Sequence, residues 1–255
     1  MKFTIQKASL WKRFSALLFD VILTVVLATG FSAVSSAIFG YDKLLDKSNT
    51  IMAQYEEEYG VDFQISSEDY EKLTETEKNN LEEARKQLAL DEEYFNISNS
   101  IFMMTLGITS ISCFLAILIW DFLIPLLLGY GRTLGKKIFG TAVIRSNGVK
   151  ATNPVLFIRA MIGTFAIETM FPLFLVIMIL FSFLGGVGII TLAGFYILQI
   201  IAICATQTNS PIHDLLCDTV VVEMDTQLIF ETEEERVDFI RRQQEEEERE
   251  AFLSF

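Results

Sequence analysis

The residues best suited to chemistry in this sequence are three acids that interrupt long apolar runs. Asp20, Asp121 and Glu168 each stand among side chains that are mostly Leu, Ile, Val and Phe. If such a run crosses a membrane, a carboxylate at its centre costs about 2.5–3.5 kcal/mol. Acids in that position must share protons, bind a cation or face a water-filled cavity. These three residues are therefore the candidates for an ion-binding or proton-binding site.

The depth of the three acids favours a shared site. On a helix with a rise of about 1.5 Å per residue, Asp20 lies roughly 10 Å from the basic start of its run at Arg13. By the same rise, Asp121 lies roughly 12 Å from the end of its run at Gly129, and Glu168 lies roughly 9 Å inside the next run. Three acids from three helices are thus predicted to fall at one level.

A structural role for two of these acids is the alternative. Asp121 precedes Pro125 by four residues, and Glu168 precedes Pro172 by four residues. Because proline removes a backbone hydrogen bond and bends a helix, either carboxylate could instead satisfy a locally broken helix. The sequence leaves both interpretations open.

A second polar group lies at one end of the apolar runs, where Arg13, Arg159, His213 and Asp214 are predicted to form an inner gate. Side chains on a helix lean toward its N-terminus, and a long basic side chain extends toward water at the interface. We therefore predict that Arg13 approaches Asp214 and not Asp20. A direct Arg13–Asp20 bond is the alternative.

Asp20 then needs another partner. The first apolar run carries a small or polar residue at every fourth position: Ala16, Asp20, Thr24, Ala28 and Ser32. Such stripes let membrane helices approach closely, so Asp20 is predicted to face the other helices and not lipid. Its partner would be Asp121, Glu168, a hydroxyl such as Thr24, or a bound cation or water.

The elements that must position these residues are membrane helices. Of the 255 residues, 51% are hydrophobic and 22 are Phe, and the mean hydropathy is +0.40. Charge-poor runs cover 21–40, 101–120 and, apart from Glu168, 160–205. A run of about 20 residues crosses a bilayer core of about 30 Å. We predict an all-α integral membrane protein with about four transmembrane helices in a small bundle.

Two parts of this topology have alternatives. The N-terminal run could be a cleaved signal peptide, but the stretch from Phe14 to Gly40 is long for that purpose and contains an acid. The run at 160–205 is long enough for helices at about 162–184 and 187–206, with Gly185, Gly186 and Gly188 as the turn. A three-helix arrangement with a re-entrant segment and an external tail is the alternative.

The distribution of charge predicts the orientation. The net charge is −13, yet residues 1–13 and 129–160 contain ten Lys or Arg and no acid, whereas residues 41–99 contain 16 acids and 6 bases. Short basic segments stay on the cytoplasmic side. We therefore expect a multi-pass protein of the cell membrane with both termini in the cytoplasm.

This orientation predicts six segments. They are 1–40 with the cytoplasmic N-terminus and first helix, 41–99 as an extracytoplasmic acidic helical insert, 100–129 as the second helix, 130–160 as a cytoplasmic basic loop with a hairpin, 161–206 as the third and fourth helices, and 207–255 as a cytoplasmic segment with His213 and Asp214, a strand and an acidic tail.

The insert is predicted to contain one or two helices. Thr74 and Glu77 have the spacing of a capping box, and Leu81, Ala84 and Leu88 follow at helical intervals. The insert is either a solvated connection or a surface that concentrates cations or binds a receptor. The acidic tail is likewise either a solvated helix or a site for a partner protein.

A small β element is predicted beside the membrane. In 141–152, "TAVIRS" and "VKAT" flank Asn147-Gly148, the favoured pair for a type I′ hairpin turn. The β-branched stretch "TVVVE" at 219–223 reads as a further strand that could pair with the hairpin.

Three stretches together resemble the RDD family of membrane proteins: "KRFSALLFD" at 12–20, "GRTLGKKIFGTAVI" at 131–144 and "HDLLCDTVVV" at 213–222. The family motif of one arginine and two aspartates matches Arg13, Asp20 and Asp214, with 133–136 and Thr219 as supporting matches. Asp218 departs from the pattern, which favours a small residue there. The resemblance implies a multi-pass membrane protein, and cation–proton exchange is a role proposed for the family.

Other classes of function lack support. The three cysteines have no metal-ligand spacing, and a single histidine cannot form a histidine-based metal cluster. The sequence contains no phosphate loop, nucleophile elbow or nucleic-acid patch, so we expect no enzyme activity, cofactor, metal or nucleic-acid partner.

The sequence thus predicts a small transporter of protons or monovalent cations in the lipid bilayer. The alternative is a non-transporting adaptor that binds partner proteins through its acidic insert and tail. Because four helices are few for a pathway within one chain, a homo-oligomer is also expected.

Overall fold

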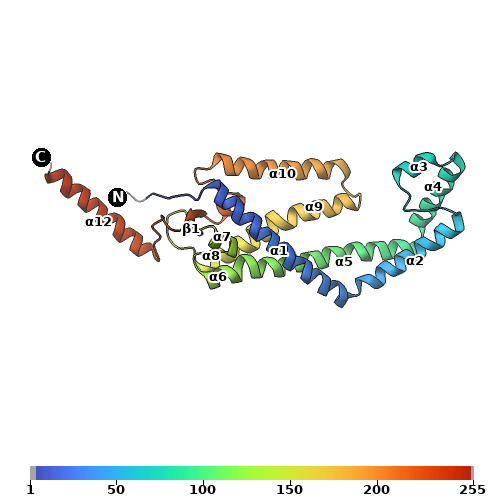
Figure 1. The fold of residues 1–255 in the computed structure, drawn as a ribbon, viewed down its shortest axis with the longest axis horizontal. Coiled ribbons are helices and arrows are strands. Elements are labelled where there is room, and N and C mark those ends of the chain that lie inside the picture. The colour runs from blue at the N-terminus through green and yellow to red at the C-terminus, as the bar shows by residue number, and fades with distance from the viewer. Residues whose placement is uncertain (1–3, 254–255) are drawn as a thin grey trace. The chain divides into compact units, whose positions relative to one another are not determined.

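The computed structural model describes residues 4–253, so the ends of the two predicted terminal segments, 1–3 and 254–255, lie outside the described residues. Within that range, four helical stretches are long and apolar enough to cross a membrane, and Figure 1 labels their helices. They are α1 (Leu10–Phe39), α5 to α6 (Glu92–Leu128), α8 to α9 (Asn153–Leu180) and α10 (Gly185–Ala205). The predicted all-α membrane fold is confirmed.

Two of these stretches contain π-helical segments, in which backbone hydrogen bonds run from i to i+5. The first, η1 (Leu118–Leu123), joins α5 (Glu92–Ile117) to α6 (Ile124–Leu128). The second, η2 (Arg159–Met170), joins α8 (Asn153–Ile158) to α9 (Phe171–Leu180). Such segments are rare, and they contain Asp121, Arg159 and Glu168.

The turn between the last two long helices differs from the prediction. It spans 181–184, where Ser182 has a φ of 61°, whereas Gly186 and Gly188 lie inside α10. A Cβ added at Gly188 would lie 2.6 Å from Ile179 Cγ1. Gly188 is therefore required for the close packing of α10 on α9, and the sequence pattern was wrongly interpreted as a turn.

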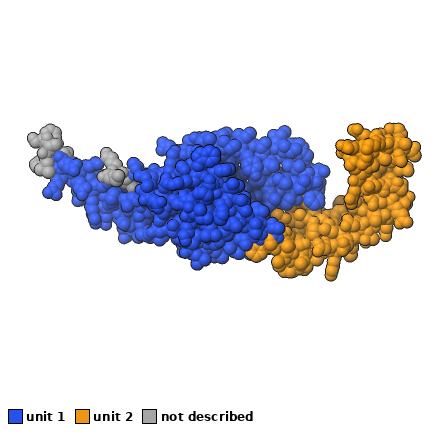
Figure 2. Space-filling view, viewed as in Figure 1, with its two compact units in different colours: residues 1–29, 112–255 blue, residues 30–111 orange. Residues whose placement is uncertain are grey.

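Contacts divide the chain into two units, which Figure 2 colours separately: residues 1–29 with 112–255, and residues 30–111. In the second unit, residues 41–90 form α2 (Tyr41–Tyr59), α3 (Ser67–Lys72) and α4 (Glu75–Leu90), where one or two helices were predicted. The capping box of Thr74 and Glu77 is present. Leu81, Ala84 and Leu88 are buried, as their spacing indicated.

The first unit contains the small sheet. Strand β1 (Thr141–Arg145) pairs antiparallel with β2 (Thr219–Glu223), and in this register Val143 lies opposite Val221. Both strands are buried, because they alternate side chains between two apolar clusters. The predicted pairing of "TVVVE" with the basic loop is therefore confirmed.

The predicted type I′ turn is wrong. The N–H of Arg145 donates to the carbonyl of Val149 at 2.8 Å, which closes a three-residue loop. A type I′ turn requires a positive φ at both central residues. Gly148 has a φ of 90°, but Asn147 is not among the described residues with positive φ. Beyond the turn, Lys150 makes only a single bridge to Ile144 and donates its N–H to the carbonyl of Phe230 at 2.8 Å.

The chain before α1 also joins the sheet, which the sequence pattern did not indicate. Lys7 forms an antiparallel bridge with Val222, and the N–H of Ala8 donates to the carbonyl of Val221 at 3.2 Å. The start of α1 is thereby anchored to β2. The remaining elements are α7 (Leu134–Ile138), α11 (Ile212–Leu216) and the acidic helix α12 (Glu233–Leu253).

Two leucines of α4, one buried and one exposed, allow the packing of the insert's core to be tested. Leu88 is 6% exposed in α4, whereas Leu90, two residues later, is 70% exposed. We expect Leu88→Ala to destabilise the insert by about 2–4 kcal/mol, because it leaves a cavity between α2 and α4. Leu90→Ala should cost no more than about 0.5 kcal/mol. Hydrogen exchange of α2 and α4 in the full chain measures both, and equal effects would contradict this packing.

Candidate functional site

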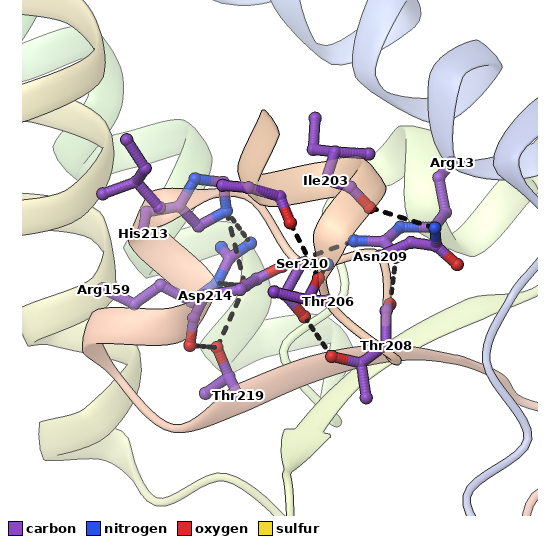
Figure 3. A network of polar contacts seen from close by, with 12 residues as sticks. Arg13, Arg159, Ile203, Thr206, Thr208, Asn209, Ser210, His213, Asp214 and Thr219 are labelled. Atoms are coloured by element: carbon purple, nitrogen blue, oxygen red, sulfur yellow. Dashed lines mark hydrogen bonds and ion pairs between the residues drawn. The ribbon is translucent and has the colours of Figure 1, made fainter. Parts of the chain in front are cut away.

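The carboxylate of Asp214 is fully buried within the first unit. Its Oδ1 accepts hydrogen bonds from Arg159 Nε and from Thr219 Oγ1, both at 2.9 Å. Figure 3 shows Arg159 and Arg13 reaching this carboxylate from opposite sides. Three elements therefore meet at one side chain, because Arg159 begins η2, Asp214 lies in α11 and Thr219 begins β2.

Arg13 completes the environment of Asp214. Its Nη2 lies 3.6 Å from Asp214 Oδ2, and its Nη1 donates to the carbonyl of Thr208 at 2.9 Å. The predicted approach of Arg13 to Asp214 is confirmed. At 3.6 Å the contact is an ion pair and not a hydrogen bond, so Asp214 Oδ2 has no hydrogen-bond partner among the described residues.

His213 connects Asp214 to Glu168. Its Nδ1 lies 2.5 Å from Glu168 Oε2, and its Nε2 lies 2.7 Å from Arg159 Nη2 and 3.4 Å from Asp214 Oδ1. In the neutral ring, Nε2 can accept from the Arg159 guanidinium while the Nδ1 proton is directed at Glu168, whereas the protonated ring carries a proton on both nitrogens. The imidazole therefore lies between two carboxylates and one guanidinium.

Hydrogen bonds through Gln199 join Glu168 to α10 and to α11. Its Oε1 accepts from Gln199 Nε2 at 3.0 Å, and Gln199 Oε1 in turn accepts from the N–H of Ile212 at 3.3 Å. Gln199 was not predicted as a site residue, because a single amide in an apolar run carries no motif.

The π-helical form of η2 explains how Arg159 and Glu168 reach the same ring. They are nine residues apart, which is about two and a half turns of an α-helix, so an α-helix would direct them to opposite sides. In η2 both contact His213. Close packing of α11 on η2 also requires Gly163, where a Cβ would lie 2.5 Å from His213 Cβ.

Asp20 belongs to a different set of contacts. It is 6% exposed, and its carboxylate accepts from Trp120 Nε1 at 3.1 Å, from the N–H of Gly135 at 2.9 Å and from Thr133 Oγ1. Lys136 Nζ lies 3.9 Å away. The prediction that Asp20 is buried without a bond to Arg13 is confirmed.

The predicted hydroxyl partner of Asp20 is confirmed in kind, because Thr133 donates to it, but the named residues Thr24, Asp121 and Glu168 are not its partners. Its hydrogen bonds go to Trp120 and to the 133–135 segment, and not to Asp121, Glu168 or Thr24. The physical reason is that the segment before β1 folds against α1 and supplies donors that a loop remote from the helices could not.

The third predicted acid, Asp121, makes no hydrogen bond or ion pair within the described part of the chain, and its charged neighbours are Lys136, Arg159, Asp20 and His213. The three acids therefore have separate contacts: Asp20 with α7, Glu168 with His213, and Asp121 with no hydrogen-bonded partner in residues 4–253. One shared set of hydrogen bonds is not formed.

Neighbouring buried charges shift the pKa values of His213 and Asp214, the two titratable side chains of α11. Burial by itself raises the pKa of Asp214, but the adjacent Arg159 and His213 outweigh it and hold that pKa well below its ordinary value. Burial lowers the pKa of His213, whereas the carboxylates of Asp214 and Glu168 outweigh burial and Arg159 and raise it above its ordinary value. Burial also lowers the pKa of Lys136.

A cavity of about 350 Å³ lies beside this network. Six titratable side chains line it: Arg13, Lys136, Arg159, Glu168, His213 and Asp214. Apolar side chains of α1 line it as well, among them Leu10, Phe14 and Leu17. All four residues of the predicted inner gate thus lie at this cavity. Within the described residues, no group of three or more His, Cys, Asp and Glu is arranged to hold a metal ion.

The comparison with family models decides the classification: the model of the RDD family matches residues 7–218. The chain belongs to the RDD family. The matched region includes the motif residues Arg13, Asp20 and Asp214. In the structure both aspartates are buried, and Arg13 forms an ion pair with Asp214. Neither the curated proteins nor the solved structures contain a match to this chain.

The departure from the RDD pattern at Asp218 has a structural explanation. Its φ of 50° lies in the left-handed region, which favours a residue without a side chain. Asp218 is kept there by local contacts, because it accepts from Ser146 Oγ and lies 3.5 Å from Arg145 Nη2.

The glycine of the RDD segment at 133–136 gives one prediction. A Cβ at Gly135 would lie 2.5 Å from the carbonyl oxygen of Ala16 and 2.8 Å from the Asp20 carboxylate. We expect Gly135→Ala to lower the stability by about 1–3 kcal/mol through overpacking. Gly194→Ala is the control, since nothing lies within 4 Å of a Cβ there. Thermal unfolding of both variants in detergent tests this, and equal unfolding temperatures would contradict it.

The pKa of His213 gives a second prediction. Because folding raises this pKa, protonated His213 stabilises the fold fully below its unfolded pKa of about 6.5, and this contribution is lost as the pH rises through the folded value. The charged groups that face the ring are Glu168, Asp214 and Arg159.

The measurement is the unfolding temperature from pH 5.5 to pH 9 for the wild type and for His213→Gln. We expect the advantage of the wild type to shrink as the pH rises above about 6.5. A constant difference between the two proteins, or one that grows with pH, would show that the sign is wrong.

Proposed function

We propose that this RDD-family protein is a small transporter that moves protons in exchange for a monovalent cation. The single observation that carries the proposal is the contact between Glu168 and His213. The pair lies beside a cavity, joins a membrane helix to α11, and holds its two proton-binding atoms 2.5 Å apart. When both ring nitrogens of His213 carry a proton, the Nδ1 proton can pass to the Glu168 carboxylate and leave a neutral ring with its proton on Nε2, without a movement of the backbone.

In this proposal, the fixed charges around the pair keep the mobile proton on it. Arg159 and Asp214 are held to each other at 2.9 Å and are both buried, so neither is suited to releasing or gaining a proton. Arg159 Nη2 lies 2.7 Å from His213 Nε2, so the ring is held with its other nitrogen, Nδ1, facing Glu168. The proton would be carried by Glu168 and His213, and Arg13 would close the network on the side of Asp214.

The residue that would bind the exchanged cation is chosen by comparing the hydrogen bonds of the two remaining acids, Asp20 and Asp121. Both oxygens of Asp20 already accept hydrogen bonds, so Asp20 is suited to a fixed role as the counter-charge of Lys136. Asp121 has no hydrogen-bond partner within residues 4–253, which leaves its carboxylate available. We therefore assign the exchanged cation to Asp121.

The proposed setting is the cell membrane with both termini in the cytoplasm. The support is the concentration of basic residues before α1 and between α6 and α8, where Lys and Arg outnumber acids. In this orientation the cavity lies at the cytoplasmic ends of the helices, so Glu168 and His213 would exchange protons with the cytoplasm.

The experiment is proton flux in liposomes that contain the purified full chain and a pH-sensitive dye. We expect a cation gradient to drive proton movement in the wild type, and Glu168→Gln to reduce the rate at least about tenfold, because the amide cannot carry the proton. Glu234→Gln, an exposed acid in α12, is the matched control and should retain the rate.

Absence of cation-driven flux in the wild type would overturn the proposal. If Glu168→Gln retained the biological activity while deletion of 230–255 or 45–95 abolished it, the protein would instead act as an adaptor for partner proteins.

A further inference from the structure

The cavity beside α11 contains a buried acceptor that no hydrogen bond in the described part of the chain satisfies. Asp214 is fully buried and lines the cavity, and its Oδ2 has no hydrogen-bond partner. A buried carboxylate oxygen without a donor is unfavourable, because its lost hydration is not replaced. Its surroundings therefore favour a ligand that offers a hydroxyl or N–H group at this point.

The same cavity contains basic groups with unused donors. Within residues 4–253, the Arg13 guanidinium makes one hydrogen bond, to the carbonyl of Thr208, and the Lys136 ammonium makes one, to Thr133 Oγ1. The cavity wall contains three basic side chains, Arg13, Lys136 and Arg159, and the two acids Glu168 and Asp214. Asp20 lies 3.9 Å from Lys136 but does not line the cavity. The wall thus offers basic groups with unused donors, which suit an anionic group.

The third feature is the apolar side of the cavity. Leu10, Phe14 and Leu17 line it and are 54%, 57% and 58% exposed. They recur at helical spacing on α1, and Ile203 of α10 lines the cavity too. Both α1 and α10 are long and apolar enough to span a membrane, so the apolar rim of the cavity lies on helices whose exposed faces suit lipid.

We propose that this cavity binds the headgroup of an anionic phospholipid that carries a hydroxyl group, with phosphatidylglycerol as the representative. The phosphate would contact Arg13 and Lys136, a headgroup hydroxyl would donate to Asp214 Oδ2, and the acyl chains would leave along Leu10, Phe14 and Leu17. The inference does not depend on proton transport, since it uses the oxygen of Asp214 that the network leaves unsatisfied.

The choice of a lipid over a soluble phosphate ester rests on the composition of the wall. A free headgroup would leave the exposed leucines and Phe14 without a partner, whereas a lipid places its chains there. The position of Arg13, three residues into α1, also fits the level at which phosphates lie in a bilayer.

Lipid chemistry separates the two polar contacts without altering the protein. The full chain is purified in detergent, stripped of lipid and titrated with dioleoyl phosphatidylglycerol, phosphatidylmethanol or phosphatidylcholine, and bound lipid is read by native mass spectrometry. Phosphatidylmethanol has the same charge as phosphatidylglycerol but no headgroup hydroxyl. We expect phosphatidylglycerol to bind about tenfold more tightly than phosphatidylmethanol, and phosphatidylcholine to bind most weakly.

Two adjacent lysines supply the matched protein variants. Lys136→Gln removes a basic group of the cavity and should reduce the preference for phosphatidylglycerol over phosphatidylcholine about tenfold. Lys137→Gln changes an exposed lysine that does not line the cavity and should retain the preference.

Three results would overturn the proposal. Equal binding of phosphatidylglycerol and phosphatidylmethanol would exclude the hydroxyl contact to Asp214, and this comparison needs only the wild type. Equal effects of the two lysine variants would indicate nonspecific attraction to the basic surface. Displacement of phosphatidylglycerol by an equal concentration of glycerol phosphate would identify a soluble ester as the ligand.

Discussion

The ion pair of Asp214 with Arg159 is the constraint on which the first unit depends. A fully buried carboxylate is stable only with close partners, because desolvation disfavours its charge strongly. Its partners come from a membrane helix, from the start of β2 and from α1. The requirement to satisfy one buried charge therefore fixes where the segment after α10 returns to the bundle, and with it the position of His213 against Glu168.

Asp20 plays the same part for the segment between α6 and β1. Its carboxylate accepts from a backbone N–H, a hydroxyl and an indole, and Gly135 allows this approach because a Cβ would collide with α1. Both RDD aspartates thus anchor a non-spanning segment to the membrane helices. The small sheet lies next to these anchored segments, since β1 and β2 each begin a few residues after one of them and pair antiparallel.

Polar groups remain available for function where this anchoring is incomplete. Asp214 uses one oxygen for Arg159 and Thr219 and leaves the other without a hydrogen-bond donor, and the basic groups around it keep unused donors. Glu168 and His213 lie on the same cavity. A proton-carrying pair and a lipid-binding surface would therefore share one wall, which makes the occupancy of the cavity relevant to any movement of protons through it.

The sequence by itself determined the membrane class, the four apolar helices, the insert helix with its capping box, the pairing of β2 with β1 and the approach of Arg13 to Asp214. These features follow from local patterns: apolar length, helical spacing and the direction of side chains on a helix. Tertiary structure decided the partners of the acids. The prediction of how deep each acid lies assumed the rise and turn of an α-helix. The wider turns of the π-helical segment η2 instead direct both Glu168 and Arg159 to His213. Asp20 found its donors in a segment 113 residues away, through a close approach at Gly135 that no local pattern encodes.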